Sequence, residues 1–593
     1  MCGIHLLLNP PESGEIRIKS MLHQSHHRGP DQSGFEKLAE NGWLGANRLK
    51  ILDLSDTASM PMRSEDGRLL LAWNGAIYNY IDLREKLALD GYRLKTSSDT
   101  EVLLYWLKAN GERGLADLHG MYSLILVDLE KQQILIARDP TGQKPLYYFR
   151  KNAFWAFSSE VRAVELGTGE KLPIDQRQFL PYLHYRFCWP DSSLIQGIAQ
   201  VLPGESMVLD FSGNVLKKTK SESQTLKKSD SSDWEMLLKK SVLSCAKADR
   251  PSGMVLSGGI DSSLMYALWY EQTGTRLPTF TAHFGKAYEK EFCDLTFAKK
   301  LGAKYPSCHE EIEISKKIVM ENWDAYAQSM DLPVGDGAGF LTWYIGKRIG
   351  DQVKVLLSGA GADELFGGYT RHWAFSQYLK NPGMTSLTGK ALGLLGLNAA
   401  RKFSSSIEED PINTFIQMAA LHPIPKNLIG EFVKYFPKED GNLKSALAFD
   451  RQFYLVNDIL KIHDSACMAH GIEGRAPYLD RELIAWASSL TESEVNKNIG
   501  KKNLKQALEH RGLQEISHRP KLGFGMPIRK WLQEEDFRDF VFSPIQWLEK
   551  HRGNHFSSEI RTLMQHPEDL VNTNFQLIWN WFVLASWLQN REK

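Results

Sequence analysis

A cysteine directly follows the initiator methionine of this chain. Removal of Met1 is expected before a small residue, and Cys2 would then carry a thiol nucleophile and a free α-amine. Such an amine titrates near ~7.7–8.0, so part of it is unprotonated at neutral pH and can accept the thiol's proton. The alternative is an ordinary second residue of a frayed terminus. The pattern predicts nucleophilic attack by an N-terminal thiolate.

A second candidate centre lies at residues 255–263, which read Val-Leu-Ser-Gly-Gly-Ile-Asp-Ser-Ser. The apolar run Met254–Leu256 predicts a strand, followed by a glycine turn and a helix from Ser262. Backbone N–H groups at such a turn favour an anion. The turn lacks Gly-Lys-Ser/Thr, so it is not a Walker A loop. Asp261 is a natural Mg²⁺ ligand beside phosphate, or alternatively the N-cap of the helix.

A similar turn follows a second predicted strand, Val353–Leu357. It reads Ser358-Gly359-Ala360-Gly361-Ala362 and continues with Asp363-Glu364. Ligands of open α/β sheets bind at the carboxyl ends of strands, so two such turns could share one Mg²⁺–nucleotide. The alternative for the two acids is a solvated helix start, where negative charge suits the helix dipole.

The chain has two parts that differ in their sequence pattern. Residues 1 to about 210 are β-rich: residues 69–73 are an apolar run that ends at Asn74-Gly75, and Met121–Leu129 and Gln133–Ala137 predict two paired strands. The polar segment Lys217–Asp233 predicts a linker or exposed loop. Beyond it, strands alternate with helices, which indicates a parallel sheet. The last third is helical and rich in tryptophan, which indicates core packing.

Bulk properties exclude several classes of partner. Among 593 residues, 71 are Lys or Arg and 71 are Asp or Glu, so neither nucleic acid nor an anionic membrane is indicated. The absence of a signal peptide or membrane span in the sequence, together with dispersed cysteines, favours a reducing cytoplasm. We interpret His26, His27 and His309 as structural rather than metal-binding. We expect the remaining cysteines to be small buried hydrophobes: Cys188, Cys245, Cys293, Cys308 and Cys467.

These motifs together resemble a known family. The turn at 257–262 resembles the pyrophosphate-binding loop of ATP pyrophosphatases, and with Cys2-Gly3-Ile4 the whole chain resembles the glutamine-dependent asparagine synthetases. Further matching segments are residues 28–31 (RGPD), 48–49 (RL), 73–75 (WNG), 77–79 (IYN), 98–101 (SDTE), 138–148 (RDPTGQKPLYY), 331–333 (DLP), 468–470 (MAH), 477–480 (PYLD), 500–501 (GK) and 519–524 (RPKLGF).

The resemblance implies an α+β N-terminal-nucleophile sandwich followed by an α/β parallel-sheet synthetase domain with a helical C-terminal part. We expect a glutaminase domain at residues 2–210, a linker at 211–235 and a synthetase domain at 236–593. Glutamine hydrolysis would supply ammonia through an internal apolar tunnel to an acyl-adenylate made from ATP. The implied partners are small molecules (glutamine, ATP, and aspartate or another carboxylate), with Mg²⁺ as cofactor and a homodimer as the assembly.

Residue roles follow from the same resemblance. Cys2 would attack the glutamine amide, Asn74 and Gly75 would form the oxyanion hole, Arg48 would pair with the α-carboxylate, and Asp99 would hold the α-ammonium. The implied ATP-binding residues are Leu256, Ser257, Gly258, Gly259, Asp261, Ser262, Ser263, Ser358 and Gly359. Asp261 and Asp363 would hold Mg²⁺, and Lys501 would steady phosphate charge during adenylation.

Three positions depart from the family pattern. Ala76 replaces a glutamate that helps bind the glutamine ammonium, Ala360 replaces an acid beside the chemistry, and residues 462–465 (IHDS) replace Lys-Val-Asp-Arg. These departures leave two alternatives beside an aspartate-specific enzyme. One is the same chemistry on another carboxylate, such as a sugar, a peptide or a secondary metabolite. The other is a catalytically impaired paralogue that serves as a binding or regulatory protein.

Overall fold

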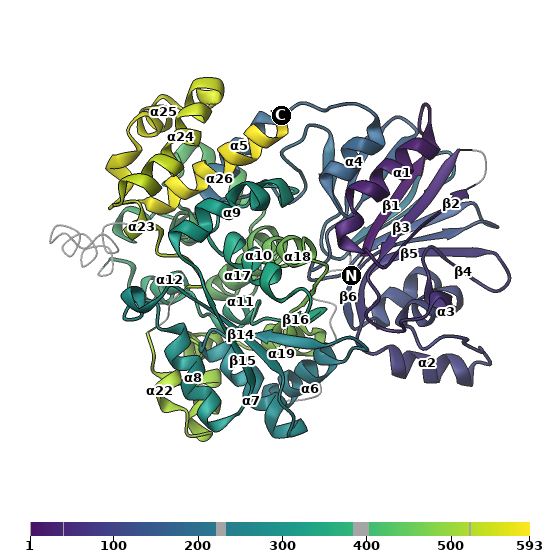
Figure 1. Ribbon diagram of the computed structural model, residues 1–593, viewed down its shortest axis with the longest axis horizontal. Coiled ribbons are helices and arrows are strands. Elements are labelled where there is room, and N and C mark those ends of the chain that lie inside the picture. Colours follow the sequence, from purple (N-terminus) through teal and green to yellow (C-terminus); the bar gives the residue numbers. More distant parts are fainter. Residues whose placement is uncertain (1, 39–40, 221–232, 384–402, 521–522, 593) are drawn as a thin grey trace.

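The computed structural model describes residues 2–38, 41–220, 233–383, 403–520 and 523–592. The chain forms two halves that meet along one face, an antiparallel β-sheet half and a half built around a parallel sheet (Figure 1). The expected nucleophile-type sandwich followed by an α/β domain is confirmed. In the described part of the chain, no helix is long and apolar enough to cross a bilayer.

The first half contains two antiparallel sheets of six strands each. Sheet one has the order β10-β8-β9-β1-β3-β2 and sheet two the order β12-β11-β7-β6-β5-β4. The strands of sheet one are β1 (Cys2–Leu8), β2 (Gln32–Leu38), β3 (Gly42–Arg48), β8 (Tyr147–Lys151), β9 (Phe154–Ser158) and β10 (Ile198–Gln200). Those of sheet two are β4 (Met62–Arg63), β5 (Leu69–Ile77), β6 (Gly120–Asp128), β7 (Gln133–Arg138), β11 (Glu205–Asp210) and β12 (Val215–Lys220).

The apolar pattern of β1 shows how the sheets are layered. Ile4, Leu6 and Leu8 pack in the core shared with sheet two, while Leu7 faces the opposite way, because side chains alternate along a strand. Leu7 joins residues of α1 (Gly14–Gln24) and α4 (Val161–Thr168), and α2 (Tyr80–Leu89) and α3 (Asp99–Asn110) pack with sheet two. Strand β1 is therefore covered on both faces.

The predicted strand pair at residues 121–137 is confirmed as β6 and β7, which pair antiparallel. Strand β5 extends beyond the apolar run at residues 69–73, because it continues through Asn74-Gly75 to Ile77 and pairs with β6 over that whole stretch. The polar segment predicted as a linker also differs at its start. Residues 217–220 belong to β12, which pairs with β11, and residues 221–232 lie outside the described residues.

The second half is built on a five-stranded parallel sheet of order β15-β14-β13-β16-β17. Its strands are β13 (Ser252–Val255), β14 (Pro278–His283), β15 (Cys308–Glu313), β16 (Val355–Leu357) and β17 (Glu473–Arg475). Helices α6 (Trp234–Ala246) and α7 (Ile260–Thr273) pack on one face, and α9 (Lys316–Ser329) and α10 (Ala338–Ile349) on the other. Both glycine turns follow strands of this sheet, as the sequence predicts.

Further helices, one of them from the first half, complete the helical part of the second half. They are α5 (Phe179–Tyr185), contributed by the first half, and α8 (Asp294–Lys304), α11 (Ala362–Phe366), α12 (Thr370–Lys380), α15 (Pro411–Ala419), α16 (Ile429–Val433), α17 (Asn442–Phe449), the π-helix Asp450–Ile459, α18 (Leu460–Met468), α19 (Arg481–Ser489), α20 (Glu492–Asn498), α21 (Lys502–His510), α22 (Gln514–Ser517), α23 (Ile528–Trp531), α24 (Glu535–Arg552), α25 (Ser558–Gln565) and α26 (Phe575–Glu592). The tryptophans of α23 and α26 are buried, which confirms core packing.

The expectation for the cysteines is confirmed in part. Cys188, Cys245 and Cys467 are buried, but Cys293 is half-buried and Cys308 is exposed. The prediction was wrong for these two because Cys308 begins the edge strand β15, where only one side of the strand has a neighbour. Cys293 precedes helix α8 at its N-cap.

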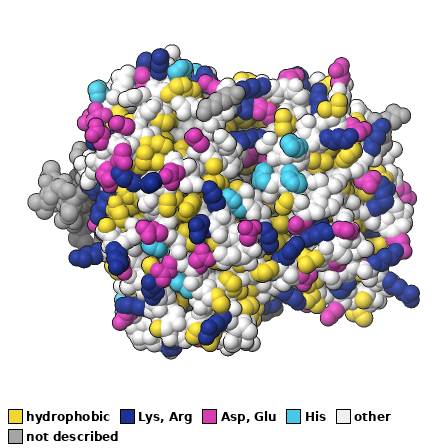
Figure 2. Space-filling model, in the orientation of Figure 1, with side chains coloured by type: hydrophobic (Ala, Val, Ile, Leu, Met, Phe, Trp, Pro, Cys, Tyr) yellow, Lys and Arg dark blue, Asp and Glu magenta, His cyan; other side chains and the backbone are white. Residues whose placement is uncertain are grey.

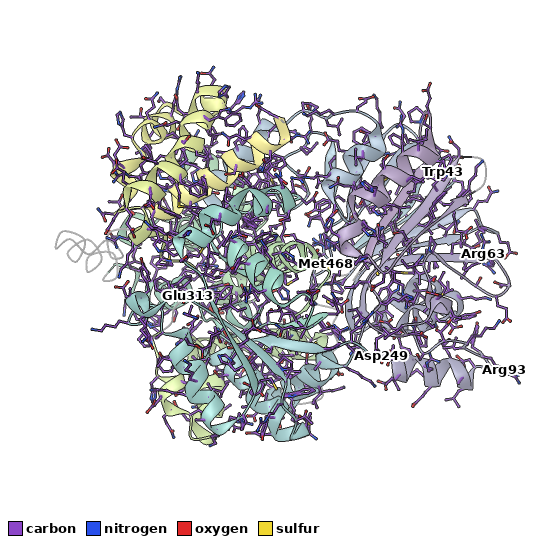
Figure 3. The ribbon with its side chains drawn as sticks, viewed as in Figure 1. Trp43, Arg63, Arg93, Asp249, Glu313 and Met468 are labelled. Carbon is purple, nitrogen blue, oxygen red and sulfur yellow. The ribbon has the colours of Figure 1, made fainter. Side chains whose placement is uncertain are left out.

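Polar contacts join the two halves. Asp249 lies at the boundary (Figure 3), where its backbone N–H donates to Ile51 O at 2.9 Å and its carboxylate accepts from the Asp53 N–H at 2.8 Å. Figure 2 shows basic and acidic side chains interspersed over the visible face, in keeping with the equal numbers of each in the sequence.

Candidate active sites

Cys2 opens β1 at the centre of the first half, and its thiol is almost fully buried. Its backbone N–H donates to Asn74 Oδ1 at 3.0 Å, which brings the predicted nucleophile and the predicted oxyanion residue together. Burial raises the pKa of the Cys2 thiol, and the neighbouring Arg48 charge offsets part of that rise. The thiol therefore needs a base before it can attack a substrate.

Asn74 presents its two amide atoms differently. Oδ1 is taken by Cys2, while Nδ2 is buried and has no hydrogen-bond partner among the described residues. A buried donor without a partner is costly and points to a ligand or a water. Gly75 follows on the same strand, and a Cβ there would lie 2.0 Å from Met121 O on β6. Only glycine fits this close pairing of strands.

The two predicted glutamine-binding residues flank this strand. Arg48 is the cross-strand neighbour of Cys2, and its guanidinium donates to the carbonyls of Leu52, Asp53 and Ser55. Asp99 begins α3, and its carboxylate accepts from the Ile77 N–H at 3.2 Å. Burial raises the pKa of Asp99 to about 6.

In the second half, the two glycine turns touch each other. A Cβ on Gly359 would lie 3.0 Å from Asp261 Cβ, so the turn after β16 contacts the start of α7. Gly258 has a φ of 58°, and a Cβ there would lie 2.5 Å from Ala298 N. Both steric limits and backbone conformation require glycine at this turn. Ser257 Oγ lies 3.2 Å from Ser262 Oγ across the turn.

Lys501 connects the two turns. Its Nζ lies 2.5 Å from Asp261 Oδ2 and 2.8 Å from Asp363 Oδ1, and the lysine is nearly fully buried. Burial lowers the lysine's pKa, but the two carboxylates outweigh it and raise the pKa above its ordinary value. Three segments distant in sequence thus converge on one point, which sequence reasoning predicted for the two aspartates.

Two predicted ATP-binding residues lie behind the turn. Leu256 packs in the core and its backbone N–H and O bond to β14, and the Ser263 side chain is fully buried. Arg519, from the matched segment 519–524, reaches the turn instead: its Nη1 donates to Ser257 O at 3.0 Å and its Nη2 to Asp294 Oδ1 at 2.6 Å. Lys521 and Leu522 of that segment lie outside the described residues.

The residues around Asp261 and Asp363 fit a magnesium ion. Mg²⁺ is usually held by one or two carboxylates together with substrate phosphates, and two carboxylates converge here beside a turn suited to an anion. Among the described residues, no cluster of three or more His, Cys, Asp or Glu side chains is arranged to hold a metal by itself. The ion would therefore need oxygen ligands from a phosphate.

Ala360 and His463 depart from the family pattern and lie in different surroundings. The acid Glu364 follows Ala360 closely in the chain. Ala360 lies in the second turn, with its N–H 3.5 Å from Ser358 Oγ. Glu364 is buried, accepts from the Tyr369 hydroxyl at 2.6 Å, and has its pKa raised to about 7 by burial and by Asp363. His463 packs against Gly474, where a Cβ would lie 2.6 Å from the imidazole. The imidazole and the missing side chain at 474 are thus complementary.

Sequence reasoning missed a set of buried charges between the halves. Glu473 and Arg475 of β17 form an ion pair at 2.6 Å, and the Arg475 guanidinium lies over the Tyr78 ring. Arg475 O also accepts from Ser358 N at 3.0 Å, so β17 contacts the neighbourhood of both sites. The sequence spacing of Glu473 and Arg475 could have indicated this ion pair, because residues i and i+2 of a strand share a face and opposite charges there can pair.

Arg28 and Lys144 converge on Asp464 of α18 from the other half. Arg28 Nη2 donates to Asp464 Oδ2 at 2.9 Å and Lys144 Nζ lies 3.5 Å from Asp464 Oδ1. Arg28 Nε also donates to Cys2 O at 3.3 Å. Both basic residues occur in matched segments of the sequence, which gave them no role.

The fold and the two sites define a glutamine amidotransferase domain joined to a synthase. The glutamine amidotransferase domain model matches residues 1–220, and the asparagine synthase model matches residues 233–589. The chain belongs to the asparagine synthase family, and it is a glutamine-dependent, asparagine synthetase-like ligase.

Several known proteins are similar to the chain. "Asparagine synthetase [glutamine-hydrolyzing] 1" of Bacillus subtilis is 28% identical over 625 residues, covering 99% of this chain and 96% of that protein. "Asparagine synthetase [glutamine-hydrolyzing] 2" of the same organism is 24% identical, covering 88% and 72%. A solved glutamine phosphoribosylpyrophosphate amidotransferase from B. subtilis covers 47% of this chain and 65% of that chain, at 21% identity and a TM-score of 0.29.

Proposed function

We propose that this enzyme hydrolyses glutamine at Cys2 and transfers the ammonia to a carboxylate that it activates with ATP, with aspartate as the default acceptor. The convergence of Asp261 and Asp363 on Lys501, between two strand-end glycine turns, is the observation that carries the proposal. This arrangement suits a polyphosphate with a divalent ion, and it lies in the same chain as an N-terminal thiol site.

In the first half, Cys2 attacks the side-chain amide of glutamine. The nitrogen of Cys2, which becomes the α-amine once Met1 is removed, is oriented by Asn74 Oδ1 and takes the thiol proton. Asn74 Nδ2 and the Gly75 N–H donate to the oxyanion, where charge develops. Water then releases glutamate from the thioester.

Binding of glutamine rests on two charged residues. Asp99 pairs with the α-ammonium, and Arg48 pairs with the α-carboxylate. Three loop carbonyls accept from Nη1 and Nη2 and fix the Arg48 guanidinium, so the glutamine carboxylate would be paired through the remaining N–H groups of Arg48. Ala76 cannot contribute a carboxylate, so Asp99 bears the recognition of the ammonium.

In the second half, the acceptor carboxylate attacks the α-phosphate of ATP, giving an acyl-adenylate and pyrophosphate. The turn at residues 257–262 and the turn at Ser358-Gly359 would hold the phosphates. Mg²⁺, held by Asp261 and Asp363, would supply neutralisation of the polyphosphate charge. Lys501 would steady the leaving pyrophosphate. Ammonia then attacks the acyl carbon, which gives the amide and AMP.

An assay of pyrophosphate and AMP with ATP, Mg²⁺ and candidate acids tests the proposal. The wild-type enzyme should release pyrophosphate with its acceptor, and Asp261→Asn or Asp363→Asn should abolish this release while glutamine hydrolysis persists. Asp324→Asn is the matched control, because Asp324 is an exposed aspartate of α9. Equal pyrophosphate release by all three variants would contradict a shared ATP site.

A different carboxylate acceptor is the second candidate, favoured by Ala360. A methyl group stands in the second turn where the family pattern places an acid, which lowers the local negative potential and leaves room for a larger anion. The change also removes a proton acceptor, a role generally worth roughly 10²–10⁴-fold in rate.

Ala360→Glu should increase asparagine synthesis if aspartate is the acceptor. No gain, with pyrophosphate release on larger acids, would favour the second candidate, and no release with any acid would favour an impaired paralogue.

We also propose a cytoplasmic enzyme that forms a homodimer. All six cysteines are free in the structure, which suits a reducing compartment. Light scattering of the purified protein tests the assembly, with a mass of 67.4 kDa for a monomer.

A further inference from the structure

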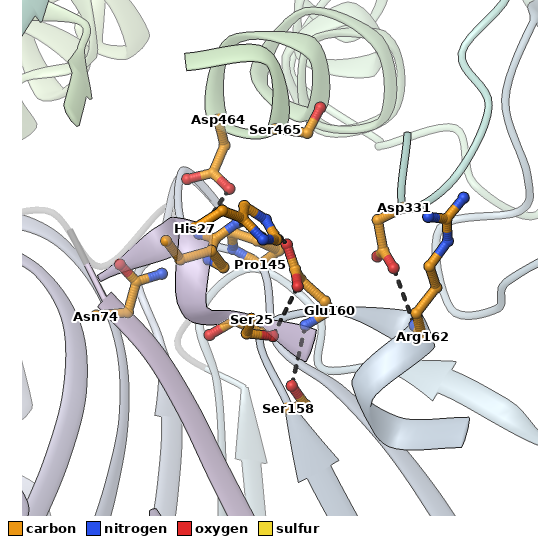
Figure 4. A network of polar contacts seen from close by, with 12 residues as sticks. Ser25, His27, Asn74, Pro145, Ser158, Glu160, Arg162, Asp331, Asp464 and Ser465 are labelled. Atoms are coloured by element: carbon orange, nitrogen blue, oxygen red, sulfur yellow. Dashed lines mark hydrogen bonds and ion pairs between the residues drawn. The ribbon is translucent and has the colours of Figure 1, made fainter. Parts of the chain in front are cut away.

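The segment Asp331-Leu332-Pro333 was singled out in the sequence without a role, and the structure places its aspartate at a helix of the other half. Asp331 Oδ1 accepts from Arg162 N at 2.9 Å (Figure 4), and Asp331 Oδ2 accepts from Val161 N at 2.7 Å. These are the first N–H groups of α4. The residue before them, Glu160, makes no side-chain cap of its own. A residue from the synthetase half therefore caps a helix of the glutaminase half.

Helix α4 is held by the synthetase half at three points. Besides the cap, Arg162 Nη1 donates to Gln328 O at 2.6 Å, and Arg591 of α26 forms a bidentate pair with Glu165. Asp331 itself is anchored through its carbonyl, which accepts from Trp587 Nε1 at 3.2 Å. The synthetase half is thus bonded directly to α4 at its first turn and along its length.

The turn that leads into α4 is bonded to the nucleophile strand. Ile4 N donates to Ser159 Oγ and Ser159 N donates to Ile4 O, both at 3.2 Å. Ile4 is two residues from Cys2. The same turn carries Glu160, which accepts from Ser25 Oγ at 2.6 Å and lies 2.9 Å from His27 Nε2 (Figure 4). The cap and the nucleophile are therefore separated by one short turn.

Asp331 and Glu160 also line a small cavity between the halves. Its volume is about 30 Å³, and Arg28 and Asp464 contribute to its wall. Although burial raises the pKa of Glu160, His27 and Arg28 lower it to about 2, so this carboxylate stays charged. The junction thus combines a charged Glu160 with the hydrogen bonds of the cap.

We propose that Asp331 is a positioning residue that couples glutamine hydrolysis to amide formation, by capping α4 across the domain boundary. The inference rests on the proposed function, since it concerns the transfer of ammonia between the two sites. Loss of the cap lets the 158–160 turn and the Cys2 strand shift against the synthetase half. Hydrolysis then continues, but less of the ammonia reaches the acyl-adenylate.

The test compares the wild-type enzyme with Asp331→Ala, Asp331→Asn and a control, Asp410→Ala. Asp410 caps α15 by the same kind of contact, to Ile412 N and Asn413 N, inside the synthetase half. Glutamate and amide are measured with glutamine, and amide alone with added ammonium. For Asp331→Ala we expect ammonium-dependent synthesis within about twofold of wild type and at least a threefold rise in glutamate formed per amide. Asp331→Asn, which keeps one acceptor oxygen, should be intermediate, and Asp410→Ala should keep the wild-type ratio.

Hydrogen exchange provides a second readout. N-caps change local helix stability by a factor of roughly 2 to 30, so the amides of residues 161–168 should exchange faster by this factor in Asp331→Ala, with β6 unchanged. Faster exchange with a wild-type glutamate-to-amide ratio would show a merely structural cap and overturn the inference. A parallel loss of ammonium-dependent synthesis would also overturn it. If the wild-type enzyme forms no amide from glutamine, the proposed function itself fails.

Discussion

The side-chain amide of Asn74 presents one atom to the nucleophile residue and the other to the space beside it. Oδ1 accepts from the nitrogen of Cys2, and Nδ2 has no partner in the described part of the chain. An amide flipped the other way would lose both features, because Nδ2 cannot accept from Cys2. The orientation of this buried amide thus decides whether Asn74 can offer a hydrogen-bond donor to a developing negative charge.

Replacing the nucleophile separates the two activities. Cys2→Ala should abolish glutamine hydrolysis, since the other cysteines lack an adjacent α-amine, and should spare synthesis from added ammonium. Both activities are measured on the same preparation. Cys308→Ala, which removes an exposed thiol, is the control and should change neither. Glutamine hydrolysis by Cys2→Ala at the wild-type rate would rule out the assignment.

The raised pKa of Asp99, about 6, predicts opposite effects of one substitution on stability and on binding. The unfolded aspartate titrates near ~3.9, so folding favours the protonated form and stability falls as pH rises from 4 through 6. Asp99→Asn should therefore increase the free energy of unfolding at pH 7.5 by up to ~3 kcal/mol, which raises the melting temperature. At pH 4 this gain should vanish.

The same substitution should weaken glutamine binding, although it increases stability. In the proposed function the ionised Asp99 pairs with the glutamine ammonium, so kcat/KM for glutamine should fall in the wild type below about pH 6 and should be low at every pH in Asp99→Asn. Calorimetric melting at two pH values and a pH profile of hydrolysis measure the two effects. A stability difference of the same size at pH 4 and pH 7.5 would contradict the linkage.

At the scale of elements, two glycines at opposite ends of α7 differ in their surroundings. Both have positive φ, 58° at Gly258 and 64° at Gly274. A Cβ on Gly258 would lie 2.5 Å from Ala298 N, while nothing lies within 4 Å of one on Gly274. The first glycine permits a close approach of two segments, and the second only closes the helix.

This contrast gives a matched pair of variants. Gly258→Ala should displace the turn and reduce ATP-dependent pyrophosphate release at least tenfold, with glutamine hydrolysis unchanged, because the turn is in the other half. Gly274→Ala should cost on the order of 1 kcal/mol of stability from its backbone conformation alone, and keep activity. Similar loss of pyrophosphate release in both variants would show a general effect on α7.

The local sequence pattern predicted those elements whose own residues determine their conformation. Strands β6 and β7 follow from alternating and apolar runs, and the two glycine turns follow from strand ends. The apolar run at residues 69–73 did not show where β5 ends, because pairing with β6 carries the strand through Asn74-Gly75 although glycine has low strand propensity. Tertiary pairing overrides local preference there.

Contacts between distant segments could not be predicted from spacing. Asp261 and Asp363 were expected to meet, since both follow parallel strands, but their distance from Lys501 depends on where α21 begins. The cap by Asp331 and the burial of Glu473 depend on how the halves are placed against each other. Neither leaves a periodic signal in the sequence. The family resemblance supplied the roles of site residues, and the structure supplied their geometry.

For the whole molecule, the buried pair of Arg28 and Asp464 joins the halves. Arg28→Met should lower the melting temperature by an amount corresponding to roughly 3–5 kcal/mol, because it leaves Asp464 buried with only the more distant Lys144. The double variant Arg28→Met/Asp464→Leu should lose less stability than the two single variants lose together, although Lys144 then lacks its carboxylate partner. Glu15→Gln, in the exposed pair with Lys19, is the control and should have no measurable effect. Additive losses in the double variant would contradict coupling of the two residues.

The two edges of the parallel sheet are protected against unwanted strand pairing in different ways. Strand β15 is partly exposed and carries Glu310, Glu311 and Glu313, whose charges discourage association with another strand. Strand β17 is protected by burial instead. It lies fully buried beside the glutaminase half, and Lys144 Nζ donates to its Gly474 carbonyl at 3.3 Å. A synthetase half produced alone would uncover that edge and its carbonyl. We therefore expect the glutaminase half to protect the synthetase half against aggregation along this strand, independently of any transfer of ammonia.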